Sequence, residues 1–259
     1  MSTPVKEPEH EVKLGFWDHI RELRKRLMYA AYGLLLGGCA IGYWVQEIVD
    51  GLMAPVRAAL PAGAQKLVYT SAIEPMMIYL KVAMYGGVYV AAPWILYQVW
   101  QFIAPGLYKK ERKLVVPFLF FGTVLFYSGV AFCYFLVMPA AFPAMLQFAS
   151  ADTLTPMLSI SEQVSLVSAM LLGFGVVFEV PVIIAFLAMI GLVSADFLAK
   201  YRRHAIVVNT FLAAIITPTG DPLNLALMAV PMCLFYEVGI ILARILGKKK
   251  PSEAVVPAA

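Results

Sequence analysis

The sequence is poor in charged residues. Only 14% of its 259 residues are Asp, Glu, Lys or Arg, whereas 61% are hydrophobic. A soluble domain carries roughly 25% charged residues, and the mean hydropathy of this chain is +0.80. The composition therefore predicts a polytopic membrane protein, with most of the chain in one membrane domain.

Cysteine and histidine are also scarce, with three of each. Cys39, Cys133 and Cys233 lie inside apolar segments, where cysteine usually behaves as a small buried hydrophobe rather than as a disulfide partner or metal ligand. The sequence contains no glycine-rich phosphate loop and no His-Glu-x-x-His zinc motif. These absences argue against an enzyme, and we expect neither a cofactor nor a metal.

Long apolar runs divide the chain into six expected transmembrane helices, since about 20 apolar residues cross a hydrocarbon core of roughly 30 Å. The expected spans are residues 27–46, 82–108, 114–137, 161–190, 204–217 and 223–243. The fifth is short, because about 14 residues at 1.5 Å each reach only about 21 Å. The expected organisation is a disordered tail at 1–13, an all-α membrane domain at 14–246 and a basic, disordered tail at 247–259.

Three local features refine this organisation. Residues 14–26 show an amphipathic pattern and predict a separate helix at the membrane surface. Residues 47–75 predict an outer loop with one short helix. Pro139, Pro143 and Pro156 predict that the third helix ends near Val137.

The Lys and Arg residues are distributed asymmetrically. With six spans, 17 of the 20 fall on one side of the membrane, and this excess marks the cytoplasmic side. Both termini are therefore expected in the cytoplasm. The net charge of +4 lies in loops and does not indicate nucleic-acid binding.

Three glutamates are candidates for function. Glu179 has 16 uncharged residues on either side, and an ionisable group at such depth is costly, so it is either functional or a structural carboxylate. Glu22 and Glu111 are the acids nearest the membrane in two cation-rich cytoplasmic segments. Each could accept a planar guanidinium. The alternatives are an i,i+4 pair between Glu22 and Arg26 and a helix-start acid at Glu111.

Five motifs, in order along nearly the whole chain, make the sequence resemble the TatC family, the core subunits of the twin-arginine protein translocase. The motifs are His-Ile-Arg-Glu-Leu-Arg-Lys-Arg-Leu at 19–27, Pro-Trp-Ile-Leu-Tyr-Gln-Val-Trp at 93–100, Phe-Ile-Ala-Pro-Gly-Leu-Tyr-Lys-Lys-Glu-Arg at 102–112, Phe-Gly-Val-Val-Phe-Glu-Val-Pro at 174–181 and Pro-Met-Cys-Leu-Phe-Tyr-Glu at 231–237. Pro55 and Lys81 also match family positions.

The resemblance implies a cup of six helices, with short fifth and sixth helices, in the bacterial cytoplasmic (inner) membrane. It implies a receptor for signal peptides that carry two consecutive arginines, an address read by a receptor. Folded proteins would be exported with the proton-motive force. The implied signal-peptide site consists of Glu22, Leu23, Arg24, Phe102 and Glu111.

The resemblance also implies partners. These are single-span subunits of the TatA and TatB types, the twin-arginine signal peptides and membrane lipids, in a hetero-oligomer with several copies. TatB-like helices would dock along the fifth and sixth spans. Glu179 matches the intramembrane glutamate of the family's concave face.

The outer turn departs from the family pattern. Thr217 matches, but Thr219 and Gly220 separate Pro218 from Asp221. Asn224 stands beside the position where the family often has glutamine. Thr217, Asp221 and Asn224 are therefore the expected partner contacts, although Asp221 is also well placed to cap the sixth helix.

Two other classes of function remain as alternatives. A proton-coupled transporter of small solutes could use Glu179, but no internal repeat of the kind common in transporters is present. A membrane enzyme is disfavoured because no catalytic set is found.

Overall fold

The computed structural model describes residues 16–60, 67–104, 115–147, 158–216 and 222–247. Within these ranges the regular secondary structure is helical, apart from one parallel bridge between Val68 and Ser159, and short turns connect the helices. The predicted all-α class is confirmed. The two expected tails lie almost wholly outside the described residues.

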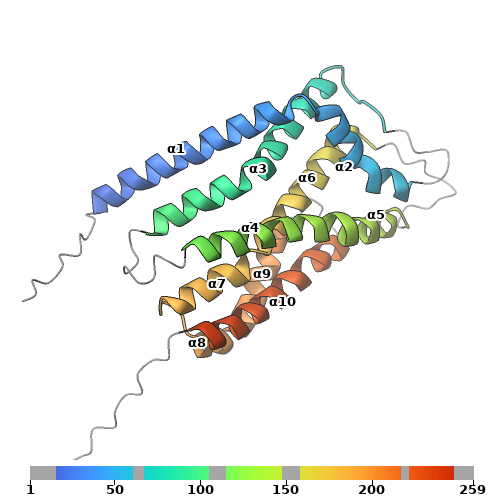
Figure 1. The fold of residues 1–259 in the computed structure, drawn as a ribbon. Coiled ribbons are helices and arrows are strands. Elements are labelled where there is room, and N and C mark those ends of the chain that lie inside the picture. Colours follow the sequence, from blue (N-terminus) through green and yellow to red (C-terminus); the bar gives the residue numbers. More distant parts are fainter. Residues whose placement is uncertain (1–15, 61–66, 105–114, 148–157, 217–221, 248–259) are drawn as a thin grey trace, which may run out of the picture.

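Ten α-helices and one π-helical turn follow each other in these ranges (Figure 1). They are α1 (Phe16–Ile41), α2 (Val45–Ala59), α3 (Glu74–Ile103), α4 (Val115–Phe132), the π-helical turn η3 (Cys133–Val137), α5 (Met138–Gln147), α6 (Ile160–Val177), α7 (Val180–Met189), α8 (Ala195–Lys200), α9 (Arg202–Ile216) and α10 (Pro222–Leu246).

Four helical segments of the described chain are long and apolar enough to cross a membrane, and a fifth is added if the bent pair α1–α2 counts as one span. The four are Glu74–Ile103, Val115–Leu146, Ile160–Met189 and Asn224–Leu246. The bend between α1 and α2 is 90°. The expected fifth span is α9, which has 15 residues, so the count of six spans stays a prediction.

The structure corrects several boundaries at the start of the chain. The amphipathic stretch 14–26 does not form a separate surface helix, because its described part is the first portion of the continuous helix α1. The first expected span, 27–46, instead ends with α1 at Ile41. The short helix expected within 47–75 is confirmed as α2.

The third helix does not end near Val137 but continues to Gln147. The Met138 N–H donates to the carbonyl of Cys133, five residues earlier. This wider turn shifts the backbone pairing just before Pro139, and such adjustments let a helix accommodate a proline. Prolines therefore did not stop this helix.

The fourth expected span is confirmed as Ile160–Met189, with a break at Phe178–Glu179 that divides it into α6 and α7. One further expectation is corrected. The sixth helix is not short, since α10 has 25 residues, or about 37 Å at 1.5 Å per residue.

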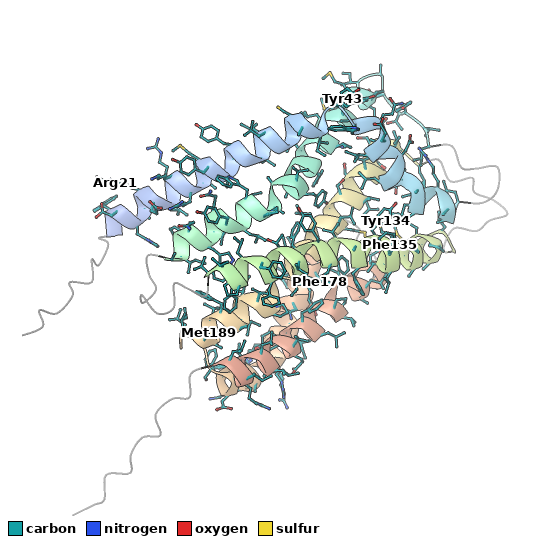
Figure 2. The ribbon with its side chains drawn as sticks, viewed as in Figure 1. Arg21, Tyr43, Tyr134, Phe135, Phe178 and Met189 are labelled. Carbon is teal, nitrogen blue, oxygen red and sulfur yellow. The ribbon has the colours of Figure 1, made fainter. Side chains whose placement is uncertain are left out.

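Helix α6 lies at the centre of the bundle and packs against α2, α3, α4, α9 and α10 (Figure 1). Phe174 of α6 is fully buried, and its ring centroid is 6.0 Å from that of Phe132. The Phe178 ring, labelled in Figure 2, lies 4.2 Å from the ring of Phe235 on α10. Aromatic contacts thus join α4, α6 and α10.

A second aromatic cluster joins α3, α4 and α7. The Trp100 ring meets the Phe186 ring edge-on at 4.6 Å, and Phe118 lies 5.5 Å from both. All three residues are buried. In contrast, many large apolar side chains on the outer helix faces are exposed, as expected of a surface that contacts lipid.

The two ends of the bundle are formed by different helices. The start of α1, the end of α3, α8 and the end of α10 gather at one end, whereas α2 and α5 lie at the other (Figure 1). At this second end the Tyr134 hydroxyl donates to the carbonyl of Gly51 on α2, at 2.7 Å. Figure 2 labels Tyr134 and its neighbour Phe135 beside α2.

Candidate functional site

The α1–α3 junction is defined here by His19, Glu22, Arg26, Gln98 and Phe102. Arg26 Nε donates to Glu22 Oε1 at 2.6 Å, and Arg26 Nη1 donates to Gln98 Oε1 at 3.3 Å. The i,i+4 pair considered from the sequence is therefore present. The contact with α3, however, was not predicted.

The aromatic side of this junction is formed by a stacked pair. The His19 and Phe102 rings lie 4.4 Å apart at an angle of 25°. His19 precedes Glu22 by three residues and Phe102 follows Gln98 by four, so each ring lies about one helical turn from the carboxylate or the amide. The predicted site residues Glu22 and Phe102 thus both belong to this junction.

The other predicted site residues are placed differently. Leu23 and Arg24 are both exposed on α1. Glu111 lies in the segment 105–114 between α3 and α4, outside the described residues. Arg21, labelled in Figure 2 near the start of α1, pairs with Asp18 at 3.3 Å.

Glu179 lies at the break between α6 and α7 and is only 7% exposed. Its Oε2 is 2.9 Å from the position that a Cβ on Gly122 of α4 would take. Within the described residues, Oε1 has no hydrogen-bond partner. Gly122 therefore leaves room for the Glu179 carboxylate, which the described helices enclose without offering Oε1 a hydrogen-bond donor.

The expected partner contacts are only partly described. Thr217 and Asp221 lie outside the described residues. Asn224 is buried at the start of α10, and its Nδ2 lies 3.0 Å from the Met145 sulfur of α5. Partner contact by any of the three stays a prediction.

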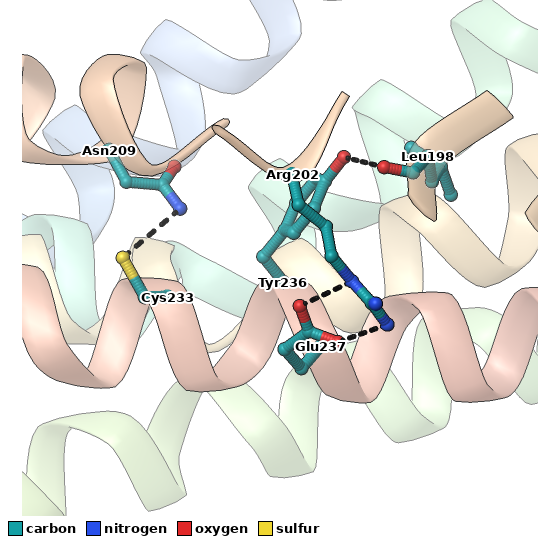
Figure 3. Close-up of polar contacts among 6 residues, drawn as sticks. All are labelled: Leu198, Arg202, Asn209, Cys233, Tyr236 and Glu237. Atoms are coloured by element: carbon teal, nitrogen blue, oxygen red, sulfur yellow. Dashed lines mark hydrogen bonds and ion pairs between the residues drawn. The ribbon is translucent and has the colours of Figure 1, made fainter. Parts of the chain in front are cut away.

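A groove of about 450 Å³ runs between α9 and α10. Arg202 and Glu237 form a two-bond ion pair at one end of it, with Nε–Oε1 and Nη2–Oε2 distances of 2.9 Å (Figure 3). Asn209 Nδ2 approaches the carbonyl of Met232 at 3.4 Å and the Cys233 sulfur at 4.0 Å. The groove floor is otherwise largely apolar.

Beside this groove the Tyr236 hydroxyl donates to the carbonyl of Leu198 at 3.0 Å (Figure 3). This bond ties α10 to the short helix α8. The groove wall is therefore fixed at its charged end.

Sequence reasoning missed a polar cluster around Glu74, which begins α3. Glu74 Oε2 accepts from the Thr70 N–H at 2.5 Å, the Thr70 hydroxyl at 2.8 Å and the Ser71 N–H at 3.3 Å. Glu74 Oε1 accepts from the Ser159 hydroxyl at 2.5 Å and the Ser161 N–H at 3.1 Å. The carboxylate joins the segment before α3 to the start of α6.

Lys81 extends this cluster along α3. Its Nζ donates to the hydroxyls of Ser161 and Ser165, each at 2.8 Å. A lysine within an apolar segment requires polar partners, so Lys81 was the signal in the sequence that could have revealed this cluster.

Metal binding has no visible basis in the described part of the chain, where no group of three or more His, Cys, Asp or Glu side chains could hold an ion.

Comparisons with known proteins agree on one family. Residues 18–231 match the family model described as Sec-independent protein translocase protein (TatC). The TatC protein of Koribacter versatilis is 40% identical over 238 residues, which cover 91% of this chain and 87% of that protein. The TatC protein of Desulforapulum autotrophicum is 42% identical over 246 residues, covering 94% and 89%.

Solved structures show the same similarity. A crystal structure titled as the twin-arginine translocase receptor TatC matches with a TM-score of 0.78 and 34% identity, over 88% of this chain and 99% of that one. A second structure of the same receptor, in the detergent DDM, matches with a TM-score of 0.77 and 33% identity, over 89% of this chain and 100% of that one.

Proposed function

This chain belongs to the TatC family of Sec-independent protein translocase proteins, and from that premise we propose that it is the subunit that binds twin-arginine signal peptides. As a member of this family it is a component of a protein translocase and a multi-pass bacterial membrane protein. Family membership disfavours the alternative of a small-solute transporter.

The observation that carries the proposal is the Glu22 carboxylate at the α1–α3 junction. It already accepts a charge-assisted hydrogen bond from a guanidinium, that of Arg26, at 2.6 Å. Its side chain is 23% exposed, so a ligand can reach it. The stacked His19 and Phe102 rings lie on the same junction and offer a planar apolar surface beside the charge.

Glu111 is the proposed second carboxylate of the site. Two adjacent arginines in an extended peptide point to opposite sides, so two acids on separate segments can take one each. An arginine guanidinium can bind a carboxylate through two parallel bonds, whereas a lysine ammonium is a point charge. Two carboxylates therefore explain a preference for paired arginines, with Leu23 and Arg24 flanking the peptide.

The rest of the proposed activity follows the family. The protein would act in the cytoplasmic membrane with both termini in the cytoplasm, exporting folded proteins with the proton-motive force. TatA- and TatB-type helices would bind in several copies. The apolar groove between α9 and α10 supports docking of such a helix, because a helix face can bury its apolar side chains there.

The test is the affinity of a labelled twin-arginine peptide for the purified protein in detergent. Glu22→Ala or Glu111→Ala should each weaken binding roughly 10- to 150-fold, as expected for loss of a hydrogen bond to a charged group. Replacing the two peptide arginines by lysines should weaken binding to a similar extent.

Glu47→Ala is the matched control, because Glu47 is an exposed acid on α2, at the other end of the molecule. It should bind the peptide normally. Unchanged binding in the Glu22→Ala, Glu111→Ala double variant would show that these acids are not the receptor site.

A further inference from the structure

Arg26 carries the same chemical group as the ligand proposed for Glu22. Its guanidinium lies against the Glu22 carboxylate at 2.6 Å and reaches the Gln98 amide oxygen at 3.3 Å. The protein thus supplies a guanidinium of its own to the carboxylate that would receive the peptide's arginine.

The burial of this contact sets it apart from an ordinary surface pair. Arg26 and Glu22 are 22% and 23% exposed, and Gln98 is 3% exposed. The Arg21–Asp18 pair joins two residues of this same helix, and its side chains are 81% and 54% exposed. Exposed i,i+4 pairs are weak, whereas a buried amide from α3 holds the Arg26 guanidinium in place.

We propose that Arg26 occupies the arginine site of Glu22 while no signal peptide is bound, and that Gln98 retains the Arg26 guanidinium when a peptide arginine displaces it. This inference rests on the proposed function, because it requires Glu22 to be a peptide-binding carboxylate. Arg26 is then an internal competitor and Gln98 is its acceptor in the bound state.

Competition of this kind lowers the affinity of every peptide that must displace Arg26 from Glu22. A two-bond arginine contact uses both carboxylate oxygens, so Arg26 must leave Glu22 Oε1. A peptide arginine replaces the lost bond with an equivalent pair, but a lysine replaces it with a point charge. Because specificity is a difference of affinities, the cost of displacing Arg26, which is the same for both peptides, lowers both affinities and leaves their ratio unchanged.

The experiment compares the affinities of twin-arginine and twin-lysine peptides for the full-length protein and its variants. Arg26→Met removes the guanidinium and keeps an apolar stem. It should bind the twin-arginine peptide roughly 3- to 10-fold more tightly, because the competent fraction of the site rises. The twin-lysine peptide should gain by a similar factor, so the ratio of the two affinities should stay unchanged.

Arg21→Met is the matched control, since it removes the same charge from the same helix and breaks the exposed pair with Asp18. It should change neither affinity by more than about twofold, as expected for an exposed ion pair. An equal gain in both variants would mean that net charge is responsible, and would overturn the proposal.

Gln98 is tested by a double-mutant cycle. Gln98→Leu should weaken twin-arginine binding in the presence of Arg26, because the displaced guanidinium then lacks its acceptor. In the Arg26→Met background the same change should have no effect. An equal loss in both backgrounds would show that Gln98 does not act through Arg26.

Failure of this proposal can be told from failure of the proposed function. If Glu22→Ala weakens peptide binding but Arg26→Met leaves it unchanged or weakens it, Glu22 is the receptor carboxylate and Arg26 is not a competitor. If Glu22→Ala binds normally, the proposed function itself fails.

Arg26→Lys serves if the methionine variant does not fold. It keeps the charge but cannot bridge Glu22 and Gln98 with a planar fork, so it should compete less strongly and the twin-arginine peptide should again bind more tightly. An unchanged affinity for the twin-arginine peptide would contradict the proposal.

Discussion

Glu179 is a buried acid at the break between two helices. The Gly122 position of α4 leaves space for its carboxylate, and one of its oxygens has no partner among the described residues. A buried polar group that lacks a hydrogen-bond partner raises the free energy of the folded state. This cost is the reason to test whether Glu179 serves transport rather than the resting fold.

We predict that Glu179→Ala blocks export while signal-peptide binding persists, because the α1–α3 junction lies elsewhere. Glu179→Gln, which keeps the size but removes the charge, shows whether the charge is required. Export of a folded reporter and peptide affinity are the two measurements. Glu162→Ala, at an exposed position in the first turn of α6, is the control and should export normally. Loss of folded protein in both Glu179 variants would instead assign it a structural role.

Glu74 plays the opposite role, since its carboxylate accepts five hydrogen bonds. These bonds hold the segment around Val68 beside the start of α6. There the Val68 N–H donates to the Leu158 carbonyl at 3.1 Å, and the Ile160 N–H donates to the Val68 carbonyl at 3.2 Å. The carboxylate thus supports a single isolated bridge between Val68 and Ser159.

We predict that Glu74→Gln speeds hydrogen exchange at the amides of Val68 and Ile160 by roughly tenfold or more, because an amide nitrogen cannot accept the bonds of a carboxylate oxygen. Exchange followed by mass spectrometry on peptides covering these positions measures the effect. Glu47→Gln should leave exchange there unchanged. Equal protection in wild type and Glu74→Gln would refute the role given to this carboxylate.

At the scale of elements, α1 is attached mainly to α3. The two helices lie side by side (Figure 1), and they approach closely where Gly38 of α1 and Gly87 of α3 meet. A Cβ at Gly87 of α3 would lie 2.8 Å from both the Gly38 nitrogen and the Leu34 carbonyl oxygen of α1. Because these are backbone atoms, they cannot move aside without separating the helices, as in other glycine-mediated membrane contacts.

We predict that Gly87→Ala lowers the free energy of unfolding by about 1–3 kcal/mol, the usual cost of overpacking. Thermal unfolding in detergent measures this loss of stability. Gly51→Ala on α2 is the matched control, because a Cβ there meets nothing within 4 Å. It should be neutral or stabilising by about 0.5–1 kcal/mol. Similar stability of the two variants would argue against close packing at Gly87.

At the scale of the whole molecule, the start of α1 and the end of α10 lie at the same end (Figure 1). That arrangement fits an even number of membrane crossings. The Lys and Arg excess predicts that this end faces the cytoplasm.

We predict that an impermeant thiol reagent labels Lys200→Cys only from the cytoplasmic side and Gln46→Cys only from the outer side. Both positions are exposed, and the background lacks the three native cysteines. Intact cells and inverted membrane vesicles give access to one side each. The reverse pattern at either position would contradict the predicted orientation.

Several boundaries could be predicted from the sequence only in part. The apolar runs located most spans, but not the break at Phe178–Glu179 or the continuation of the third helix through Pro139. A proline's effect depends on whether neighbouring turns can adjust, and here the π-helical turn allows it. The short sixth helix implied by the family resemblance was wrong, because α10 continues to Leu246.

The sequence by itself determined the membrane class, the helical architecture and the candidate acids. Hydropathy and charge act locally along the chain, and in lipid each backbone segment must satisfy its own hydrogen bonds as a helix. Only the tertiary structure decided what each acid contacts. Glu22 shares Arg26 with Gln98, which lies 72 residues from Arg26, and Glu74 meets Ser159, 85 residues away. Such contacts depend on how helices distant in sequence pack together, which no local pattern records.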